Sequence, residues 1–492
     1  MELALQTKMF IGGEFTPGSD GAMEAIINPA TEDVIGEAPV GSMADAEAAL
    51  AAAHGSYANG PWRRMTPRQR VETMQAFYDA LERRKDAIVR LLIAEAGATV
   101  ALANGAQWAN GMKHFRFALD HAGRDFTKLS LPELTSAAGG RKLLGTSIVR
   151  REPAGVVAAI TPYNYPFMLN MVKVVPALLM GNSVVLKPSP YTPFSALVFG
   201  EAAIEAGLPK GILNVITGGK EVGELLTTDK RVKLVTFTGS DKVGAAIMAQ
   251  AAPTLKRLLL ELGGKSAMIV RPDADLDRAA AAGLSGFTSH CGQGCALMTR
   301  HLVHNSVRAQ YVEKLKALAE KVMVGDPADP ATQMGPLIRA AQRDRVEHFV
   351  QGAIDSGARL VSGGRRPGHL SRGFFFEPTF FDDVDNSSAL AQEEIFGPVG
   401  AVIGFDTDEE AIRIANDSEF ALAASIFSAD AGRAYEILQQ IDTGRGAING
   451  GAGTQLSDEP FGGNRRSGYG RENGIEGLLE FTNPNAISFH AA

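Results

Sequence analysis

The chain has 492 residues, of which 45% are hydrophobic, 21% are charged and 7% are aromatic, and its formal net charge is -7. This composition excludes a disordered or fibrous chain, and the length suggests two or three domains. The acidic balance, with no run of Lys or Arg, argues against a nucleic-acid-binding protein, because phosphate contacts need a basic face.

The N-terminal stretch MELALQTKMFIGGEF has no basic region followed by an apolar core, so we expect no secretory signal. No apolar run approaches the roughly 18 to 20 residues that a membrane span requires. The sequence has two cysteines, which fits a reducing compartment and excludes a disulfide framework. We therefore expect a cytoplasmic protein that binds no membrane.

The first part of the chain is dominated by helical patterns. Residues 66–96 repeat apolar positions at spacings of three and four, begin with Thr66-Pro67 and end at Gly97. This pattern predicts one amphipathic helix. Residues 101–123 predict another.

The next part alternates short apolar runs with helical stretches. Continuous runs rich in β-branched residues are typical of strands that are buried on both faces of a sheet. These runs are GVVAAI (155–160), SVVLK (183–187), LNVIT (213–217), LVTFTG (234–239) and SAMIV (266–270). A helix is expected among them at 192–206, opened by Thr192-Pro193 and closed by Gly207. The alternation predicts a parallel sheet of the doubly wound type.

A second alternation follows from about residue 300 and predicts a second α/β domain. Its expected helices and strands are helices at 307–322, 339–356, 407–416 and 430–441, and strands at 358–362 and 400–404. Two glycine-rich stretches, 362–373 and 449–468, predict loops, and the second is long enough to be functional. The strand-like AISFH at 486–490 would fray alone, so we expect it to pair with another strand.

Both cysteines lie in one short stretch, SHCGQGCALMTR at 289–300. A metal site needs three or four ligands, and beyond Cys291, Cys295 and His290 there is no second Cys/His pair at ligand spacing, so we expect no metal. A disulfide across three residues would be strained and out of place in the cytoplasm. Two readings stay open for Cys295, a small packing residue or a nucleophile. Gly292 and Gly294 favour the nucleophile, because glycines let backbone amides approach a developing charge closely.

Six motifs place the chain beside a known family. They are TPYNYPF (161–167), FTGS (237–240), ELGGKS (261–266), GQGC (292–295), EEIFGPV (393–399) and PFGGNRRSGYGRE (460–472). In order and spacing they resemble the NAD(P)-dependent aldehyde dehydrogenase superfamily over nearly the whole chain. Each motif alone is weak evidence, and six in register are strong evidence.

The resemblance implies a catalytic role for three residues. Cys295 attacks the aldehyde to form a thiohemiacetal, which becomes a thioester when hydride leaves for the cofactor. The side-chain amide of Asn164 and the backbone amide of Cys295 hold the oxyanion. Glu261 activates the water that hydrolyses the thioester.

The residues themselves give these roles uneven support. Glu261 closes the apolar run RLLLELGG, which is unexpected because ionised carboxylates avoid buried strands unless they are paired or shifted in pKa. The alternative is an edge-strand glutamate that faces water. Without the family resemblance, the sequence favours Asn164 as a turn residue in TPYNYP.

The expected cofactor site begins at Gly239-Ser240, which lie between a predicted strand and a predicted helix, with Gly244 one turn further on. Free amides at a helix N-terminus suit a pyrophosphate. By resemblance, Lys187 reaches the adenosine ribose and Glu394 holds the nicotinamide ribose. The full set expected to contact the cofactor is Thr161, Pro162, Lys187, Ser189, Gly239, Ser240, Gly244, Leu262, Glu394 and Phe396.

Many relatives have a glutamate three residues after this lysine, where it would repel a 2'-phosphate, and this chain has Pro190. The absence of that glutamate removes the main reason to exclude NADP. We expect NAD as the cofactor, with NADP allowed as well.

The expected substrate channel is mostly apolar, and each of its residues is also consistent with a place in the core. Its predicted side chains are Tyr163, Phe167, Met168, Met171, Gly294, Leu297, Gln455 and Leu456. Tyr163 stands where relatives usually have tryptophan, and Gly294 where many have a bulkier residue, which should leave the channel roomier. No arginine pair is present to grip a second carboxylate. We therefore expect a hydrophobic aromatic or aliphatic aldehyde as the substrate.

The resemblance implies an α/β fold with two Rossmann-like doubly wound domains and a small β oligomerisation element. The expected boundaries are a dinucleotide-binding domain at 1–134 and 154–262, a catalytic domain at 263–465, and an oligomerisation element at 135–153 and 480–492. The element implies a homodimer or a homotetramer.

Three alternatives remain at this stage. One is a CoA-acylating relative, against which Glu261 argues because it would activate water. Another is a cysteine hydrolase that pairs Cys295 with a histidine such as His290 or His301. The last is an inactive binding protein on the same fold.

Overall fold

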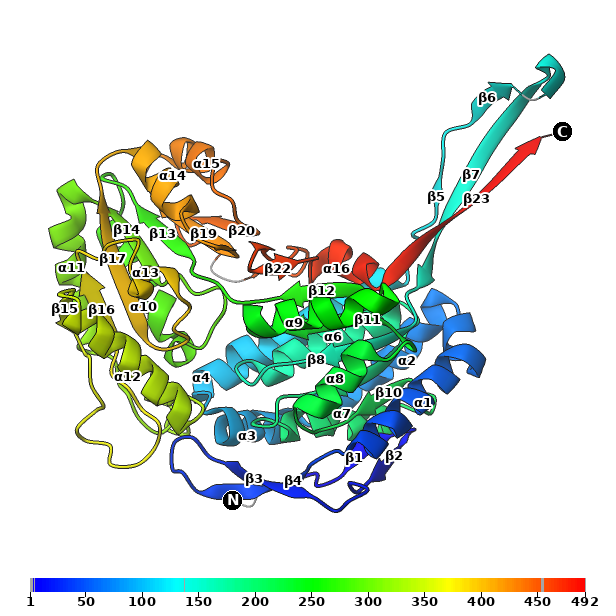
Figure 1. Ribbon diagram of the computed structural model, residues 1–492, viewed down its shortest axis with the longest axis horizontal. Coiled ribbons are helices and arrows are strands. Elements are labelled where there is room, and N and C mark those ends of the chain that lie inside the picture. Colours follow the sequence, from blue (N-terminus) through cyan, green and yellow to red (C-terminus); the bar gives the residue numbers. More distant parts are fainter. Residues whose placement is uncertain (1–2, 4, 137, 453–454, 492) are drawn as a thin grey trace.

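Two sheets of mainly parallel strands and a projecting β arm organise the chain (Figure 1). The computed structural model describes residues 3, 5–136, 138–452 and 455–491. The protein has the α/β fold predicted from the sequence, with two doubly wound units and a small β element.

The first unit is built on an eight-stranded sheet. In order across the sheet its strands are β2 (Glu14–Thr16), β1 (Met9–Ile11), β10 (Leu213–Val215), β9 (Ser183–Lys187), β8 (Val156–Ile160), β11 (Val232–Thr238), β12 (Arg257–Glu261) and β22 (Gly468–Tyr469). The strands from β10 to β12 are parallel. From β8 the chain moves outward through β9 and β10, and then returns to build β11 and β12 on the other side. A doubly wound sheet opens a crevice at the carboxyl ends of its strands at such a reversal, here between β8 and β11.

Helices cover both faces of this sheet. They are α1 (Met43–Asn59), α2 (Pro67–Glu82), α3 (Lys85–Ala96), α4 (Val100–Leu102), α5 (Asn110–Ala122), α6 (Pro166–Leu179), α7 (Phe194–Glu205), α8 (Lys220–Thr228), α9 (Asp241–Ala251) and α16 (Gly474–Glu480). Alternate residues of one strand enter different clusters, since Val157 packs into one hydrophobic core and Val156 into another. This double burial is why β8 is apolar at consecutive positions.

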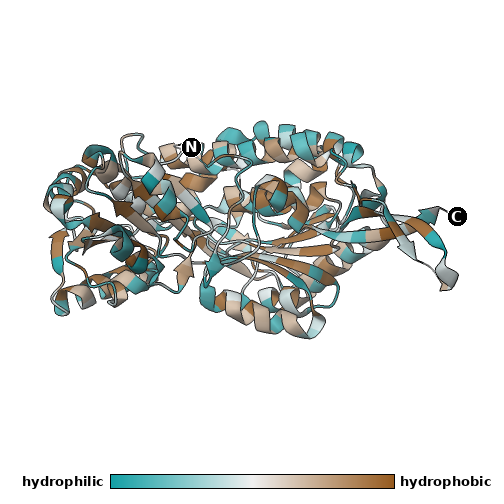
Figure 2. Cartoon of the chain, turned by 90° about the horizontal axis from the view of Figure 1, so that it is seen from above, coloured by the Kyte–Doolittle hydropathy of each residue, from teal (hydrophilic) through white to brown (hydrophobic). Residues whose placement is uncertain are grey.

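The second unit repeats the plan with a seven-stranded sheet. Its strands in order are β15 (Arg359–Ser362), β16 (Thr379–Asp382), β17 (Val399–Phe405), β14 (Arg300–His304), β13 (Ala267–Val270), β19 (Ala423–Phe427) and β20 (Arg445–Ile448). Its helices are α10 (Leu276–Thr288), α11 (Asn305–Ala319), α12 (Ala340–Asp355), α13 (Ala389–Gln392), α14 (Asp408–Asn416) and α15 (Ala431–Leu438). Two short pairs lie outside the main sheets, β3 (Met23–Ile27) with β4 (Val34–Pro39), and β18 (Phe420–Ala421) with β21 (Asn464–Arg465). Figure 2 shows apolar strands through the middle of both units and hydrophilic residues on the outer helices.

The predicted strands and most predicted helices are confirmed within a few residues, and one prediction was wrong. Residues 66–96 form two helices, α2 and α3, with a break at Arg83-Arg84. Arg84 leaves helical geometry, and its side chain pairs with Glu201 and Glu205 of α7. So brief a break barely disturbs the apolar spacing on either side, which is why the sequence pattern did not reveal it.

The predicted helix at 101–123 is interrupted in a different way. Its middle, Ala103–Ala109, is a π-helical segment between α4 and α5. The chain also returns to the first unit near its end, where β22 joins the first sheet and α16 packs on α5 and α6. The domain boundaries themselves stay a prediction.

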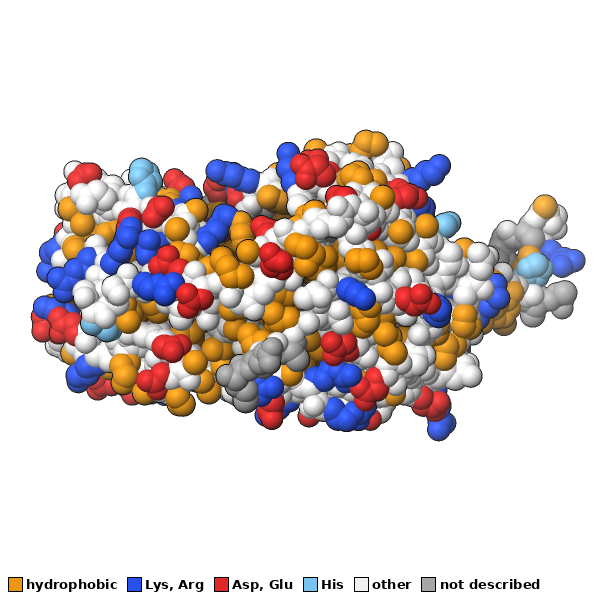
Figure 3. Space-filling model, turned by 90° about the horizontal axis from the view of Figure 1, so that it is seen from below, with side chains coloured by type: hydrophobic (Ala, Val, Ile, Leu, Met, Phe, Trp, Pro, Cys, Tyr) orange, Lys and Arg blue, Asp and Glu red, His pale blue; other side chains and the backbone are white. Residues whose placement is uncertain are grey.

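The projecting arm consists of β5 (Lys128–Leu129), β6 (Glu133–Ser136), β7 (Lys142–Pro153) and β23 (Thr482–Ala491). The predicted pairing of AISFH is confirmed, because β23 runs antiparallel to β7 with Ile487 opposite Ile148. Figure 3 shows the arm extending beyond the body of the molecule. Leu131 and Phe489 on it are 86% and 50% exposed, which is unusual for large apolar side chains in a single chain.

No helix in the described part of the chain is long and apolar enough to cross a membrane. The cytoplasmic location stays a prediction.

Candidate active site

A cavity of about 730 Å³ lies where the two units meet. The segments that follow β8 and β11 line one side of it, through Asn164 and Gly239, and the second unit contributes Cys295 and Glu394. This is the crevice that the strand order predicts at the carboxyl ends of β8 and β11. Most of the residues predicted to do chemistry therefore come together from distant parts of the sequence.

The cysteine loop follows α10 and begins with a tight 3₁₀ turn, Ser289–Gly292. His290 and Cys291 both have positive φ, 48° and 54°, which is a strained conformation for side chains of their size. A Cβ atom on Gly292 would lie 1.9 Å from the carbonyl oxygen of Gly397, so only glycine fits there. Strain of this kind persists only where surrounding packing fixes the loop.

The two cysteines have different surroundings. Cys291 is fully buried in a hydrophobic core, and burial raises its pKa far above its usual range. Cys295 lies half-buried on the cavity. Burial, followed by the charges of Glu261 and Glu394, also raises the pKa of Cys295. The packing reading thus applies to Cys291, and Cys295 is a thiol that needs a base to ionise at neutral pH.

Glu261 is the last residue of β12 and is 1% exposed. Its carboxyl group lies beside the Cys295 thiol, and neither carboxyl oxygen has a good hydrogen-bond partner among the described residues. Burial, followed by the nearby charge of Glu472, raises the pKa of Glu261 to about 8. The group is therefore mostly protonated at neutral pH and able to exchange a proton just above it.

A buried ion pair lies behind Glu261. Lys173 of α6 contacts the carboxylate of Glu472, and its ammonium group also donates to Thr236 Oγ1 at 3.1 Å. Both charged side chains are almost inaccessible, at 0% and 2% exposure. The two charges act on Glu261 in opposite directions, since Glu472 raises its pKa and Lys173 lowers it.

Asn164 follows β8 and is aimed at the same cavity. Its side-chain Nδ2 donates to the backbone carbonyl of Gln293 at 2.8 Å. The amide carries a second N–H, and the side chain is 3% exposed. A fixed neutral amide in a buried position stabilises developing negative charge without reorganising.

Two glycines in the segment that joins the sheets allow this close assembly. A Cβ on Gly263 would lie 2.5 Å from Glu394 Oε2, and a Cβ on Gly264 would lie 2.3 Å from the carbonyl oxygen of Cys295. The N–H of Gly264 donates to Glu394 Oε1 at 3.0 Å. The glycines of ELGGKS therefore let the backbone lie directly against both groups.

The residues on the other side of the cavity fit a dinucleotide. Helix α9 begins at Asp241, capped by the side chain of Ser240, so its first amides and its positive end face the cavity. A Cβ on Gly239 would lie 2.4 Å from the Phe237 ring, so a residue larger than glycine would collide with the ring at this position. Thr238 Oγ1 is buried on the same wall without a partner among the described residues, which leaves it free for a ligand. The volume is ample for a dinucleotide cofactor.

The remaining predicted cofactor residues lie close to this wall. Lys187 ends β9 and is buried, which lowers its pKa to about 8. Thr161 donates its hydroxyl to Asn170 Oδ1 at 2.7 Å, and Ser189 accepts from the N–H of Tyr191. The described lining of the cavity includes none of these three, nor Leu262 and Gly244, so their contact with the cofactor stays a prediction. The side chain of Leu262 lies 2.6 Å from the position that a Cβ on Gly244 would take.

Glu394 and Phe396 line the cavity from the second unit, and Pro162 and Tyr163 line it from the first. Burial raises the pKa of Glu394 to about 7. Phe396 has a positive φ of 57°, and its ring meets Tyr163 edge-on at 6.0 Å between centroids. This aromatic contact joins the two units across the cavity.

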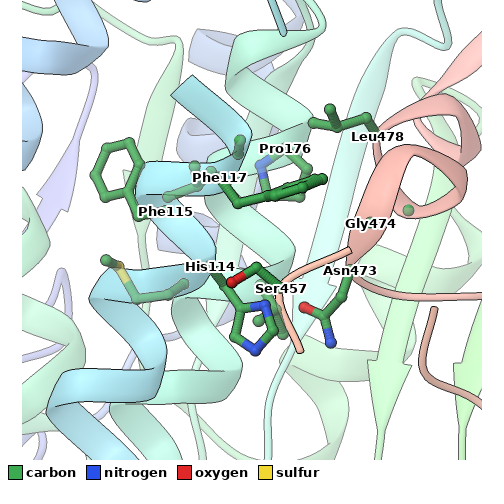
Figure 4. A pocket seen from close by; sticks show the side chains of 13 residues that line it. His114, Phe115, Phe117, Pro176, Ser457, Asn473, Gly474 and Leu478 are labelled. Atoms are coloured by element: carbon green, nitrogen blue, oxygen red, sulfur yellow. The ribbon is translucent and has the colours of Figure 1, made fainter. Parts of the chain in front are cut away.

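The predicted substrate residues are scattered. Phe167 is fully buried and stacks on Trp108, so it lies in the core rather than on the cavity. Met171 lines a separate space of about 20 Å³ between α5, α6 and α16. His114, Ser457 and Asn473 line the same space (Figure 4). That space holds about one water and is too small for an aldehyde.

The other predicted substrate residues lie nearer the surface or behind the nucleophile. Met168 is half-buried beside Gly111. Gly294 and Leu297 line a space of about 10 Å³ behind the cysteine loop. The carbonyl of Gln455 accepts from Lys113 Nζ at 2.8 Å, and Leu456 is 52% exposed. Their role in binding substrate stays a prediction.

The two histidines weighed as partners of Cys295 have other contacts. His301 lies in the core, where its ring bonds the carbonyl of Met298 and the hydroxyl of Tyr311. The ring of His290 packs against Tyr165, and burial lowers its pKa to about 4. Among the described residues no group of three or more Cys, His, Asp or Glu is arranged to hold a metal ion.

The sequence reasoning missed several residues that shape the site. Lys173 and Glu472 are 299 positions apart, and a lone lysine in the apolar stretch FMLNMVKVVPALL was the available signal. Gln107, whose side chain reaches the Asn164 turn, carried no signal in the sequence.

A model of the aldehyde dehydrogenase family matches residues 15–487. The chain is 38% identical over 478 residues to a betaine aldehyde dehydrogenase of Brucella suis, covering 96% of this chain and 95% of that protein. Its structure resembles a betaine aldehyde dehydrogenase from Staphylococcus aureus in complex with NAD+, with a TM-score of 0.93, 35% identity and coverage of 99% and 95%. It resembles an NAD-dependent aldehyde dehydrogenase from Sinorhizobium meliloti equally well, with a TM-score of 0.93, 35% identity and coverage of 98% and 94%.

The contact between Glu261 and Cys295 predicts a pH effect on thiol reactivity. Since the Glu261 carboxylate raises the pKa of Cys295, Glu261→Gln should let the thiolate form at lower pH and speed its alkylation by iodoacetamide above pH 8. The rate at each cysteine can be followed by mass spectrometry from pH 6 to 10, with buried Cys291 as the internal control. An unchanged or higher midpoint for Cys295 would contradict the contact.

Proposed function

This chain belongs to the aldehyde dehydrogenase family and is an oxidoreductase that uses NAD(P)+, and on that premise we propose that it oxidises its aldehyde through a covalent intermediate on Cys295. The observation that carries the proposal is the convergence of Cys295, Glu261 and Asn164 on one buried cavity beside a dinucleotide-sized wall. The three residues supply the three things that the reaction needs, a nucleophile, a base and an oxyanion donor.

In the first step, Cys295 Sγ bonds to the carbonyl carbon of the aldehyde. The thiol proton passes to Glu261, which is in contact with it, because the raised pKa of Cys295 leaves little thiolate at neutral pH. The carbonyl oxygen takes the electron pair of the C=O bond and becomes an oxyanion. The free N–H of Asn164 and the backbone N–H of Cys295 stabilise that charge.

Residues around the cavity would hold NAD+. The N-terminus of α9, with Gly239 and Ser240, suits the pyrophosphate, and Lys187 and Glu394 suit the two riboses. When bound, NAD+ accepts the hydride that leaves the adduct carbon, so that the adduct becomes a thioester.

Hydrolysis then releases the acid. Glu261 first releases the thiol proton to solvent. In its ionised form it then takes a proton from water, whose oxygen bonds to the thioester carbon. The C–S bond breaks with its electron pair going to sulfur, which frees the acid and the Cys295 thiolate. Burial is the main cause of the raised pKa of Glu261, and the Lys173–Glu472 pair adjusts it through opposite effects of its two charges. Hydrolysis by water distinguishes this reaction from transfer of the acyl group to CoA.

We assign cofactor binding to residues 1–134 and 154–262, and the nucleophile to a catalytic domain at 263–465. The pairing of β22 with the first sheet and the contacts of α16 with α5 and α6 support adding residues 468–480 to the first domain. NAD is the favoured cofactor, because the solved relative holds NAD+, and Pro190 leaves NADP allowed.

The substrate side supports an uncharged aldehyde. Tyr165 and Leu169 lie one helical turn apart at the start of α6, beyond Asn164, and the side chain of Tyr165 lies near Cys295. Neither side chain carries charge, which favours an aromatic or aliphatic aldehyde over an acid semialdehyde. Betaine aldehyde, which names two of the relatives, is the competing substrate.

The pH dependence of turnover tests the role of Glu261. Its pKa of about 8 predicts that kcat rises as pH increases through that value, because the base must lose its proton to activate water. Above pH 8, where loss of the Glu261 charge lets the Cys295 thiolate form without a base, Glu261→Gln should keep a single burst of reduced cofactor and lose steady turnover by about 100-fold or more. Stopped-flow absorbance at the reduced nicotinamide band checks both. Steady turnover in this variant would point to another base.

A substrate panel tests the reaction itself. Wild-type enzyme should reduce NAD+ with medium-chain aliphatic or aromatic aldehydes at a higher kcat/KM than with betaine aldehyde, and without CoA. Cys295→Ala should abolish reduction, and Cys291→Ala should retain turnover because Cys291 lies off the cavity. Turnover by Cys295→Ala, or hydrolysis that needs no nicotinamide, would refute the proposal.

The arm supports a homodimer or homotetramer, because its exposed leucines and Phe489 need a partner surface. Light scattering after size exclusion should give two or four times the 52.0 kDa chain. Replacing Ile487 and Phe489 by Asp should lower that mass, and Met323→Asp, on an exposed site of the second unit, should leave it unchanged. A monomeric wild-type protein would contradict the assignment.

A further inference from the structure

One glutamine outside the cavity is bonded directly to the segment that carries the oxyanion donor. Gln107 lies in the π-helical segment Ala103–Ala109 and is fully buried. Its side-chain Nε2 donates to the backbone carbonyl of Asn164 at 3.0 Å. Single π-helical turns inside helices are rare and occur frequently at functional sites, which makes the placement of this side chain notable.

The carbonyl of Asn164 depends on side chains for its hydrogen bonds. The first carbonyl used by α6 is that of Tyr165, which accepts from the N–H of Leu169 at 2.9 Å. The carbonyl of Asn164 thus lies just before the helix, in a buried position where a missing partner is costly. The ring of His290 also lies against this carbonyl, and because burial lowers its pKa to about 4 the ring is neutral and has one N–H to donate, so it is a second side-chain partner beside Gln107.

The same π-helical segment is locked to α6 by packing. Trp108, the next residue, stacks on Phe167 at the start of α6 with 5.2 Å between ring centroids and an interplanar angle of 18°. A hydrogen bond and an aromatic stack from adjacent residues therefore fix the start of α6 and the turn before it.

The side chain of Asn164 is bonded to the loop that carries Cys295. Its Nδ2 donates to the carbonyl of Gln293, and Gln293 is itself fixed, since its Oε1 accepts from the N–H of Ile338 at 3.0 Å and its Nε2 donates to the carbonyl of His290 at 3.1 Å. Gln293 thus bonds the side chain of Asn164, and Gln107 bonds its backbone.

We propose that Gln107 is a positioning residue that holds the Asn164 turn so that its side-chain amide faces the oxyanion. The inference rests on the function proposed above. Gln107 is not among the residues that line the cavity, so it acts through Asn164 and not on the substrate. A displacement of the donor by about 1 Å is enough to lower the rate strongly, because oxyanion stabilisation depends on fixed geometry.

The test is a double-mutant cycle between Gln107 and Asn164. Gln107→Leu keeps the size and removes the donor, and it should lower kcat about tenfold while KM for NAD+ changes less than about twofold. In the Asn164→Ala background the same change should lower kcat less than about twofold, because the group it positions is gone. An equal factor in both backgrounds, or no loss in the first, would overturn the inference.

A second variant guards against a simple folding defect. Burial raises the pKa of a glutamic acid at this position, so Gln107→Glu should donate to the Asn164 carbonyl while protonated and lose that bond when ionised. Its kcat relative to wild type should therefore fall as pH rises, and a constant ratio would count against the positioning role. Gln250→Leu makes the same chemical change at a glutamine on α9 that bonds Thr227, and it should leave kcat and its pH profile unchanged.

The cycle separates this inference from the proposed function. If Asn164→Ala alone leaves kcat unchanged, the oxyanion role in the proposed function fails, and Gln107 has nothing to position. If Asn164→Ala lowers kcat and Gln107→Leu adds its full factor to it, the proposed function stands and only the role of Gln107 is wrong. Thermal unfolding and NAD+ affinity of each variant show whether the fold is retained.

Discussion

The contact between a thiol and a carboxyl group, both withdrawn from water, governs the chemistry of this site. Cys295 and Glu261 lie side by side, and burial raises the pKa of each. In such surroundings two negative charges oppose one another, so ionisation of one group hinders that of the other. Glu261, with a pKa of about 8, is the group that gives up its proton first near physiological pH. It is therefore able to serve first as the proton acceptor for the thiol and later as the base for water.

The fold supplies this contact by bringing together segments that are remote in sequence. Strand order in the first sheet reverses between β8 and β11, and the ends of those strands deliver Asn164 and the N-terminus of α9 to one crevice. The chain then crosses to the second sheet through Gly263 and Gly264, where any side chain would collide with Glu394 or with the Cys295 loop. The buried Lys173–Glu472 pair behind Glu261 is costly to desolvate, and such a pair is weak evidence of stabilisation. The presence of this ion pair is better explained by its effect on the neighbouring base, Glu261, than by a contribution to stability.

The sequence predicted the elements that are buried on both faces, because β8, β9 and β11 are continuous apolar runs. It did not predict β14, since RHLVH places Arg300 and His301 in a buried strand, where Arg300 donates to carbonyls of Lys265, Ile414 and Ala415. Such compensation by tertiary contacts cannot be read from a local pattern.

The same holds for the site. Family motifs predicted Cys295, Glu261 and Asn164, whereas Lys173, Glu472 and Gln107 act through contacts between distant segments. Phe167 and Met171 are apolar, lie near a motif and were expected on a channel, whereas their side chains lie in or beside the core, so their role in binding substrate stays a prediction.

The central claim is that the substrate carbon becomes bonded to one sulfur before the acid is released. The most direct test is to quench the enzyme during turnover with aldehyde and NAD+, digest it with trypsin and locate the acyl group by fragment-ion mass spectrometry. Cleavage after Arg278 and Arg300 leaves both cysteines on one peptide, so the fragments must distinguish them. The account predicts an acyl group on Cys295 alone, enriched in the Glu261→Gln variant, in which hydrolysis is blocked. An acyl group on Cys291 or another residue, or none in that variant, would contradict it.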